Sequence, residues 1–212
     1  DGIVDPAVYR PSSGTWFTAL SSGGYATASW RQWGASGDVP VPADYDGDRR
    51  MDLAVYRPAA GAWYVLRSTT NFTASHTVVW GASTDVPVPA DYDGDGFADV
   101  AVYTPATGVW SVRLSSGSTR SWQWGAAGDT PVVGDYDGDG LADPAVYRPS
   151  AGYWFVLRSS TNFTGSQAWQ WGVSGDEPVV GDFVGDGRAD LTVFRPSSGV
   201  WFVAFSSTGY AT

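Results

Sequence analysis

The sequence predicts an all-β fold built from tandem copies of one unit of four short strands. An acidic nonapeptide recurs at a nearly fixed interval, tryptophans recur in the same register, and turn-forming residues separate short apolar runs. The 212 residues include 27 Gly and 13 Pro, and 15% are aromatic, a composition typical of strands and tight turns. No segment combines helical periodicity with capping residues, so we expect no long helix.

The acidic nonapeptide sets the period of the repeat. It runs from Asp44 to Asp52 and returns at residues 91–99, 135–143 and 182–190, so that its last Asp advances by 47, 44 and 47 residues. Residues 1–5 form the second half of a fifth copy. Two tryptophan series keep this register, one after a Gly-containing turn and one before a Gly: Trp16, Trp63, Trp110, Trp154 and Trp201, and Trp33, Trp80, Trp124 and Trp171.

Each unit contains four predicted strands. In the second unit they cover residues 39–45, 53–57, 62–67 and 77–80, with the acidic loop between the first and the second. A period of about 47 residues with four strands is typical of one blade of a β-propeller. The predicted fold is therefore a β-propeller of four-stranded blades, about five repeats long, in a single domain over residues 1–212. A parallel β-helix would need shorter turns, and a β-sandwich gives no reason for strict repetition.

The first and last predicted blades are incomplete. The sequence begins at the second strand of one unit and stops near the fourth strand of another. Two interpretations stay open: the chain is an excerpt of a larger propeller, or a neighbouring chain supplies the missing strands. Exposed strand edges favour such self-association through the terminal blades.

Composition excludes several classes of partner. The sequence has no Cys and no Lys, and its formal net charge is −10, which argues against binding to nucleic acid or to anionic membrane surfaces. No apolar stretch approaches the roughly 18 residues that a membrane helix needs, so we expect no membrane insertion. Seventeen of the 21 Asp residues lie in the acidic loops, so most of this charge belongs to local sites.

Four carboxylates in one short loop require an explanation. Each close pair repels by about 1 kcal/mol even in a water-like dielectric, which a bound cation would reverse. Ca²⁺ takes six to eight oxygen ligands, whereas Mg²⁺ prefers fewer protein ligands and more water. An EF-hand needs a Glu at position 12 and flanking helices, and neither is present. The alternative is a set of Asx-turns in a solvated acidic hairpin.

The loops resemble the calcium loops of FG-GAP/VCBS repeats, in which Asp-x-Asp-Gly-Asp-Gly-x-x-Asp joins the first two strands of a propeller blade. The resemblance implies carboxylate ligands at positions 1, 3, 5 and 9 and a backbone carbonyl at position 7. It implies three to four Ca²⁺ ions. The ligand sets are Asp44, Asp46, Asp48, Arg50 and Asp52; Asp91, Asp93, Asp95, Phe97 and Asp99; Asp135, Asp137, Asp139, Leu141 and Asp143; and Asp182, Asp186, Arg188 and Asp190.

The copies of the loop are unequal. The loop at 182–190 has Val184 at position 3, and we expect it to bind more weakly. Arg49 replaces a Gly that would tolerate a left-handed conformation. The first copy keeps only Asp1 and Asp5, so we expect it to be empty unless another segment completes it.

The resemblance also implies a function and a location. FG-GAP/VCBS propellers occur in secreted and surface proteins of bacteria and in the integrin α-subunit, where they serve adhesion or recognition. We therefore expect a secreted or cell-surface bacterial module that binds a glycan or an extracellular protein, with calcium providing rigidity. The alternative is a structural or self-assembling surface module, or the non-catalytic accessory domain of a larger secreted enzyme. With one His, one Glu and no Lys or Cys, the sequence gives no support for an enzyme.

Several further residues are candidates for structure or recognition. We expect the Trp of the Gly-x-Trp series to be core, and Trp30, Trp122 and Trp169 to lie at the surface as candidate sugar-stacking groups. Four Asp residues precede the first strands and are expected to cap turns or to pair with the repeated arginines, which we expect to tie neighbouring blades. These two sets are Asp38, Asp85, Asp129 and Asp176, and Arg10, Arg57, Arg148 and Arg195. Asn71 and Asn162 match the glycosylation sequon but are interpreted as turn residues.

Overall fold

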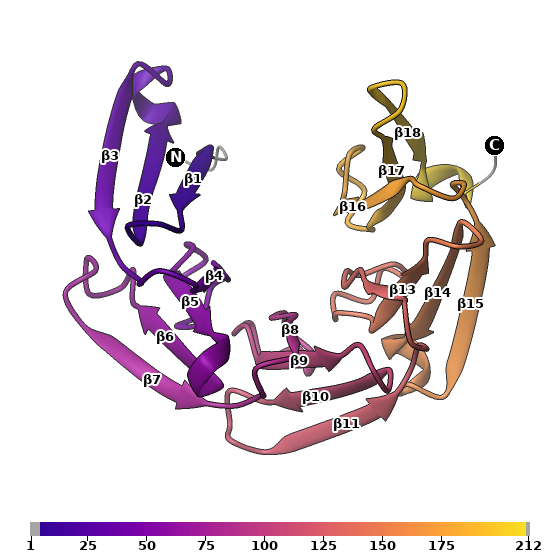
Figure 1. Cartoon of the computed structure of the whole chain (residues 1–212), viewed down its shortest axis with the longest axis horizontal. Coiled ribbons are helices and arrows are strands. Elements are labelled where there is room, and N and C mark those ends of the chain that lie inside the picture. Colours follow the sequence, from indigo (N-terminus) through magenta and orange to yellow (C-terminus); the bar gives the residue numbers. More distant parts are fainter. Residues whose placement is uncertain (1–4, 211–212) are drawn as a thin grey trace. The chain divides into compact units, whose positions relative to one another are not determined.

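The fold is all-β and of the β-propeller class. The computed structural model describes residues 5–210, and the named strands in this range form five antiparallel sheets, two of three strands and three of four. Consecutive strands are neighbours within each sheet, as in the meander of a propeller blade (Figure 1). The chain divides into two compact units, residues 1–83 with blades 1 and 2, and residues 84–212 with blades 3 to 5.

The first unit contains one three-stranded and one four-stranded blade. Blade 1 consists of β1 (Ala7–Arg10), β2 (Thr15–Leu20) and β3 (Thr27–Gln32). Blade 2 consists of β4 (Val39–Pro40), β5 (Leu53–Arg57), β6 (Ala62–Leu66) and β7 (Ser75–Val79).

The second unit contains three blades of the same design. Blade 3 consists of β8 (Val86–Pro87), β9 (Val100–Thr104), β10 (Val109–Arg113) and β11 (Thr119–Gln123). Blade 4 consists of β12 (Thr130–Pro131), β13 (Ala145–Arg148), β14 (Tyr153–Arg158) and β15 (Gly165–Gln170). Blade 5 consists of β16 (Glu177–Gly181), β17 (Asp190–Arg195) and β18 (Val200–Ala204).

The four strands expected in the second unit are observed, with the third ending one residue earlier than predicted, the fourth at 75–79 instead of 77–80, and the largest difference in the innermost strand. The strand predicted over residues 39–45 pairs continuously with β5 for only two residues. Pairing then alternates, because the Val41 N–H donates to the Ala54 carbonyl at 2.9 Å and Ala43 bridges to Asp52. The chain thus leaves the sheet early to enter the acidic loop.

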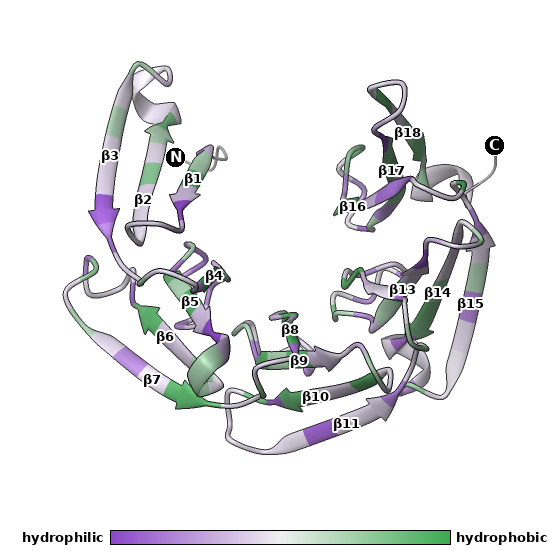
Figure 2. Ribbon diagram, viewed as in Figure 1, coloured by the Kyte–Doolittle hydropathy of each residue, from purple (hydrophilic) through white to green (hydrophobic). Residues whose placement is uncertain are grey.

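Burial is concentrated in the middle strands of each blade. In blade 2 the three central residues of β5 are buried, whereas the residues of β7 alternate between exposed and half-buried. Figure 2 shows the same contrast in blade 3, where β10 carries hydrophobic residues and β11 is largely hydrophilic. The outer strand therefore presents one face to solvent.

Within each unit, consecutive blades are joined by the tryptophans that precede Gly. The Trp33 indole donates to the carbonyl of Tyr64 at 3.1 Å across the seam between blades 1 and 2. In the second unit, Trp124 donates to Phe155 at 3.1 Å and Trp171 donates to Phe202 at 3.3 Å. These bonds fix the side of one blade against the third strand of the next.

The Gly-x-Trp series is core, as expected, except in blade 5. Trp63, Trp110 and Trp154 are fully buried and Trp16 is nearly so. Trp201 is 55% exposed. The same residue type is therefore buried in blades 1 to 4 and exposed in blade 5.

The repeated arginines hold the turns that link blades, not a neighbouring sheet. Arg57 donates through both Nε and Nη2 to Asp38, with both distances 2.8 Å, and the same bidentate pairs join Arg148 to Asp129 and Arg195 to Asp176. Asp38 also accepts the Ala35 N–H, so it caps the turn before β4. Both interpretations are thus confirmed for Asp38, Asp129 and Asp176. Where blade 3 has Thr104, its hydroxyl donates to Asp85 at 2.8 Å.

Helical structure in the described range is limited to single 3-10 turns: Ser21–Gly23, Pro58–Ala60, Ser159–Thr161 and Ser206–Thr208. None of them has the length and apolar character that would let it span a membrane.

Candidate functional site

Each acidic loop connects the first two strands of a blade. In three of the loops an isolated β-bridge joins the two ends of the loop: Ala43 to Asp52, Ala90 to Asp99 and Gly134 to Asp143. In blade 5 the two ends are joined by the last pair of the β16–β17 ladder, Gly181 and Asp190. The four loops therefore present equivalent positions in the same local frame.

The Asp at position 1 organises the backbone of its own loop. In the loop at 44–52, Oδ1 of Asp44 accepts the Gly47 N–H and Oδ2 accepts the Arg49 N–H, each at 2.6 Å. Asp91, Asp135 and Asp182 accept the corresponding two amides of their loops. The carboxylate is thus held at the centre of a turn of converging N–H groups.

The two carboxylate oxygens of the Asp at position 3 have different surroundings. Oδ2 of Asp46 accepts the Thr69 hydroxyl, at 2.5 Å, and Oδ2 of Asp137 accepts the Ser160 hydroxyl at 2.6 Å. The other oxygen, Oδ1 of Asp46, Asp93 and Asp137, is buried and has no hydrogen-bond partner. A buried carboxylate oxygen without a partner is costly unless something absent from the protein itself compensates it.

The Asp at position 9 is buried, and both of its carboxylate oxygens accept backbone hydrogen bonds. Asp52, Asp99, Asp143 and Asp190 are fully buried. In each, Oδ2 accepts the N–H of position 2 and Oδ1 accepts the N–H of a serine that follows the third strand, as with Tyr45 and Ser68 at Asp52. These residues join the loop to the body of the blade.

Burial also perturbs the ionisation of position 9. It raises the pKa of Asp99 and of Asp143 to about 6, although backbone N–H groups stabilise the charged forms. The neighbouring carboxylates add to the increase, those of Asp93 and Asp95 at Asp99 and that of Asp137 at Asp143. The carboxylates of a loop therefore interact unfavourably while no cation lies among them.

Three loops bring carboxylate oxygens close enough to hold one ion. One oxygen from each of three Asp residues lies within 4.8 Å of the others in Asp44, Asp46 and Asp48; in Asp91, Asp93 and Asp99; and in Asp135, Asp137 and Asp143. The remaining predicted carboxylates, Asp52, Asp95 and Asp139, belong to the same loops but lie outside these triplets. The N–H groups of Arg50, Phe97, Leu141 and Arg188 donate to the Asp at position 5, and the role of their carbonyls stays a prediction.

The loop at 182–190 and the amino-terminal copy differ from the other three. In the described residues, no such triplet includes Asp182, Asp186 or Asp190. Val184 at position 3 is exposed, and Phe183 replaces the Tyr whose hydroxyl elsewhere donates to the innermost strand. Of the first copy, Asp5 accepts the Ser21 N–H at 2.7 Å, and Asp1 lies outside the described residues.

Sequence reasoning missed the serines that complete the loops. Ser21, Ser68, Ser115, Ser159 and Ser206 each lie 16 residues after a position-9 Asp, and the last four also donate their hydroxyls to the Asp at position 5. Their constant spacing was the signal that could have identified them. Each candidate site is therefore built from two segments, the loop and the turn after the third strand.

Neighbouring loops in the second unit are joined to one another. The Ala142 N–H donates to the carbonyl of Asp91 at 2.8 Å, and the Ala189 N–H donates to that of Asp135 at 2.6 Å. Position 8 of one loop thus binds position 1 of the loop before it.

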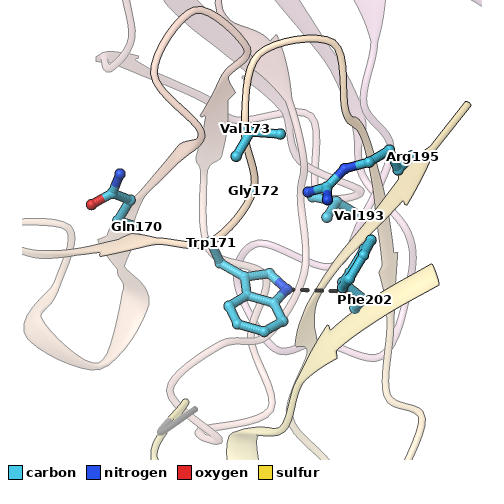
Figure 3. A pocket seen from close by; sticks show the side chains of 7 residues that line it. All are labelled: Gln170, Trp171, Gly172, Val173, Val193, Arg195 and Phe202. Atoms are coloured by element: carbon cyan, nitrogen blue, oxygen red, sulfur yellow. Dashed lines mark hydrogen bonds between the residues drawn. The ribbon is translucent and has the colours of Figure 1, made fainter. Parts of the chain in front are cut away.

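A hollow of about 320 Å³ lies at the seam between blades 4 and 5. Figure 3 shows Trp171 and Gly172 on one side of it and Arg195 and Phe202 on the other. The Trp171 indole donates to the Phe202 carbonyl, and Arg195 pairs with Asp176 while lying 4.3 Å from the Phe202 ring centre. A Cβ on Gly172 would approach the Tyr147 hydroxyl to 2.6 Å, so the hollow is tightly shaped by packing. The main side chains that line this hollow are thus already engaged in contacts within and between blades 4 and 5.

The candidate surface aromatics differ in exposure. Trp30 is 72% exposed, whereas Trp122 packs on Phe163 with ring centres 4.4 Å apart and Trp169 packs on Tyr210 at 4.6 Å. The sequon residues are turn residues, as interpreted: Asn71 and Asn162 adopt left-handed conformations, with φ of 52° and 55°. The aromatics therefore contribute partly to contacts between blades.

The antiparallel blades and the acidic loop in each of blades 2 to 5 define a β-propeller with repeated candidate cation sites. Residues 44–102 match the family model of the FG-GAP-like repeat, and the same loop returns at 135–143 and 182–190. The chain is thus a β-propeller that contains an FG-GAP-like repeat over residues 44–102. No curated protein matches the sequence.

Solved structures of other propellers resemble the fold. Virginiamycin B lyase from Staphylococcus aureus is 8% identical with a TM-score of 0.57, and 94% of this chain covers 65% of the lyase. A catalytically inactive histidine-to-alanine variant of that lyase, with quinupristin, gives a TM-score of 0.58 at 8% identity over 96% of this chain and 71% of the lyase. An Agrocybe aegerita lectin that recognises non-reducing terminal N-acetylglucosamine is 19% identical with a TM-score of 0.59, and 92% of this chain covers 61% of the lectin. These similarities concern the fold, and this chain spans less than two thirds of the first lyase and of the lectin.

Proposed function

We propose that this chain is a calcium-stabilised propeller module that recognises glycans outside the cell. The observation that carries the calcium assignment is the buried, unpartnered Oδ1 of Asp46, Asp93 and Asp137, one in each complete loop. Each of these residues belongs to a triplet of converging carboxylates. A cation in each loop would compensate the buried oxygen and the mutual repulsion together.

Calcium suits these loops better than magnesium. The donors are all hard oxygens on flexible side chains, and a loop offers three or four carboxylates in addition to its carbonyls, a set that matches the six to eight ligands of Ca²⁺. Mg²⁺ demands octahedral geometry and retains several waters, so it would leave part of the set unused. We propose three ions, at 44–52, 91–99 and 135–143, and weaker binding at 182–190, which lacks the position-3 carboxylate.

Calcium titration with thermal melting tests this assignment. Calcium that binds only the folded state should stabilise it by about 4 kcal/mol at a thousandfold excess over Kd, and a chelator should remove this gain. Asp93→Asn should lower the calorimetric stoichiometry by one ion, whereas Glu177→Gln, which removes a charge from an exposed strand residue, should not. A melting temperature that chelation leaves unchanged would contradict the proposal.

Recognition rather than catalysis is the proposed activity. The lone histidine, His76, is half-buried in β7, and its Nδ1 accepts the Nε–H of Arg67 at 3.2 Å. It is therefore committed to a structural bond within its blade. The fold similarity to a lectin supports a glycan as the ligand class, and the association of FG-GAP repeats with extracellular proteins supports the location.

Self-association is the second candidate function. Trp201 in blade 5 and Val8 in blade 1, with exposed fractions of 55% and 65%, correspond to residues that are buried in blades 2, 3 and 4. Faces of this kind are complementary to each other in the seams between blades, so a second copy of the chain fits them. Light scattering over a range of concentrations separates the candidates: assembly without glycan binding would favour a structural module.

A further inference from the structure

A polar hollow of about 290 Å³ lies beside the loop at 135–143, between blades 4 and 5. Both blades belong to the second unit. The side chains that matter for its chemistry are two arginines, one loop carboxylate, one amide and two aromatics: Arg158, Arg188, Asp137, Gln167, Trp169 and Tyr210.

The first arginine has a buried donor with nothing to bind. Nε of Arg158 is buried and has no hydrogen-bond partner. The corresponding residue of blade 2, Arg67, donates its Nε–H to His76 at 3.2 Å. In blade 4 the place of this histidine is taken by Gln167, nine residues after Arg158 as His76 is after Arg67. A buried guanidinium donor without an acceptor indicates that the acceptor comes from a ligand.

The second arginine reaches the same hollow from the neighbouring loop. Arg188 lies against the backbone of Gly138, since a Cβ built there would lie 2.4 Å from its Nε. At the equivalent position the loops at 91–99 and 135–143 carry Phe97 and Leu141. Among the described residues, the ion pairs that form involve neither Arg158 nor Arg188. Two guanidiniums that lack a carboxylate partner therefore line one hollow.

The aromatic side of the hollow is rigid. The rings of Trp169 and Tyr210 meet edge to face with centres 4.6 Å apart. The Tyr210 hydroxyl lies 2.9 Å from the carbonyl of Ala189 and 3.1 Å from that of Tyr136, so the ring is fixed between the two loops. A fixed aromatic wall suits the apolar face of a sugar ring, while the arginines suit an anionic substituent.

The charge of the hollow depends on the adjacent loop. Asp137 lines it and also belongs to the carboxylate triplet of the loop at 135–143. With a cation in that loop, the charge of Asp137 is compensated, and Arg158 and Arg188 remain as the charged side chains that line the hollow.

We propose that this hollow binds an acidic sugar residue, with its carboxylate on Arg158 and Arg188 and its ring against Trp169. This assignment rests on the proposed glycan recognition and specifies its ligand class. The site occurs once, because no other seam between described blades brings arginines to both of these positions.

Calorimetry of the full chain in excess calcium tests the site. The probes are a glucuronic acid oligomer, the same oligomer as its methyl ester, and acetate. We expect the acidic oligomer to bind at least about tenfold more tightly than the ester, because one charge-assisted hydrogen bond is worth about that factor. Arg158→Gln and Arg188→Gln should each remove this preference.

Two variants outside the hollow serve as controls. Arg67→Gln, at the position of Arg158 in blade 2, and Arg113→Gln, at an exposed position of β10, each remove the same charge and should leave the preference for the acidic oligomer within about twofold. Melting in calcium verifies that all four variants fold. Equal binding of acid and ester, unaffected by the Arg158 and Arg188 variants, would retain glycan recognition but overturn this site.

The remaining outcomes are equally decisive. If acetate binds as tightly as the acidic oligomer, the hollow recognises the carboxylate alone and makes no use of the sugar ring, which overturns the assignment. If neither oligomer binds while calcium still raises the melting temperature, both this site and the proposed glycan recognition fail, and the calcium assignment stands.

Discussion

Arg49 occupies a backbone conformation that the other three loops give to glycine. Its φ is +65°, and the equivalent Gly96, Gly140 and Gly187 have φ of 85°, 87° and 84°. A residue with a Cβ is disfavoured in this left-handed region. The sequence alone predicted this conflict, because the glycine is present in every other copy of the nonapeptide.

Arg49→Gly should therefore stabilise the folded protein by up to about 1 kcal/mol, because it relieves the left-handed strain. Chemical denaturation in saturating calcium measures the change. Arg50→Gly, which removes the same charge one residue later, should give no stabilisation. Equal stabilisation by both variants would indicate a charge effect in place of strain.

Ser159 shows how a single hydroxyl joins two segments of a candidate site. Its hydroxyl lies 2.9 Å from Oδ1 of Asp139 and 2.7 Å from Oδ1 of Asp143, so its single proton is shared between the two acceptors, and its N–H donates to Oδ1 of Asp143 as well. The backbone bond would survive a substitution, but the hydroxyl bonds would not.

Ser159→Ala should destabilise the protein by about 1–2 kcal/mol and weaken calcium binding to one site of three, since the buried carboxylate of Asp143 and the exposed carboxylate of Asp139 lose this donor. Ser166→Ala, at an exposed position of β15, provides the control. Calorimetric titration of both variants resolves the effect, and unchanged affinity at every site would argue against a supporting role for the hydroxyl.

At the scale of the elements, blade 5 has lost what blades 2 to 4 retain. Its loop keeps the hydrogen bonds of Asp182 and Asp190 but has Val184 at the position of the unpartnered carboxylate. The frame of the loop therefore persists without the full donor set.

Val184→Asp should add one calcium ion to the calorimetric stoichiometry, because it restores the missing donor in a loop whose backbone already matches the others. Val180→Asp, on the adjoining strand β16, places the same charge outside the loop and should leave the stoichiometry unchanged. A stoichiometry that stays constant in Val184→Asp would mean that other losses, such as Phe183 for Tyr, disable this loop.

The periodicity of the sequence was sufficient to predict the strands, but not the side chains from other segments that contact the loops. The second strand of blade 2 was predicted at 53–57 and is observed there, since Pro58 ends it and the acidic loop precedes it. The serines of the turns after the third strands were missed because Ser is common in turns and carries no metal-ligand signal. The pocket of Arg158 and Arg188 was also missed, because it needs side chains from two blades that only the fold brings together.

For the whole molecule, the charge of −10 is concentrated in the loops, and this makes the response to calcium depend on pH. In the ion-free protein, burial raises the pKa of Asp99 and Asp143 to about 6 from the ordinary value of 3.8. Between these values the folded state binds more protons than the unfolded state, so ion-free stability falls as the pH rises towards 6. Above pH 6 the folded protein must hold both carboxylates charged.

The increase in melting temperature caused by calcium should therefore be larger at pH 7 than at pH 5, because calcium must displace protons at the lower pH. Melting of dialysed protein with and without calcium chloride at both pH values measures it. In Asp99→Asn the dependence on pH should be reduced. An equal increase at pH 5 and pH 7 would contradict the role of these carboxylates.

The backbone hydrogen bonds between neighbouring loops have a consequence for how the loops bind ions. Because the Ala142 N–H binds the carbonyl of Asp91, the loops at 91–99 and 135–143 share a hydrogen-bonded backbone, and the Ala189 bond extends it to 182–190. Ordering one loop therefore pre-organises the next, which lowers the conformational entropy that the second ion has to offset. Occupancy along these blades is thus expected to be cooperative, and the propeller would change from loose to rigid over a narrow interval of calcium concentration.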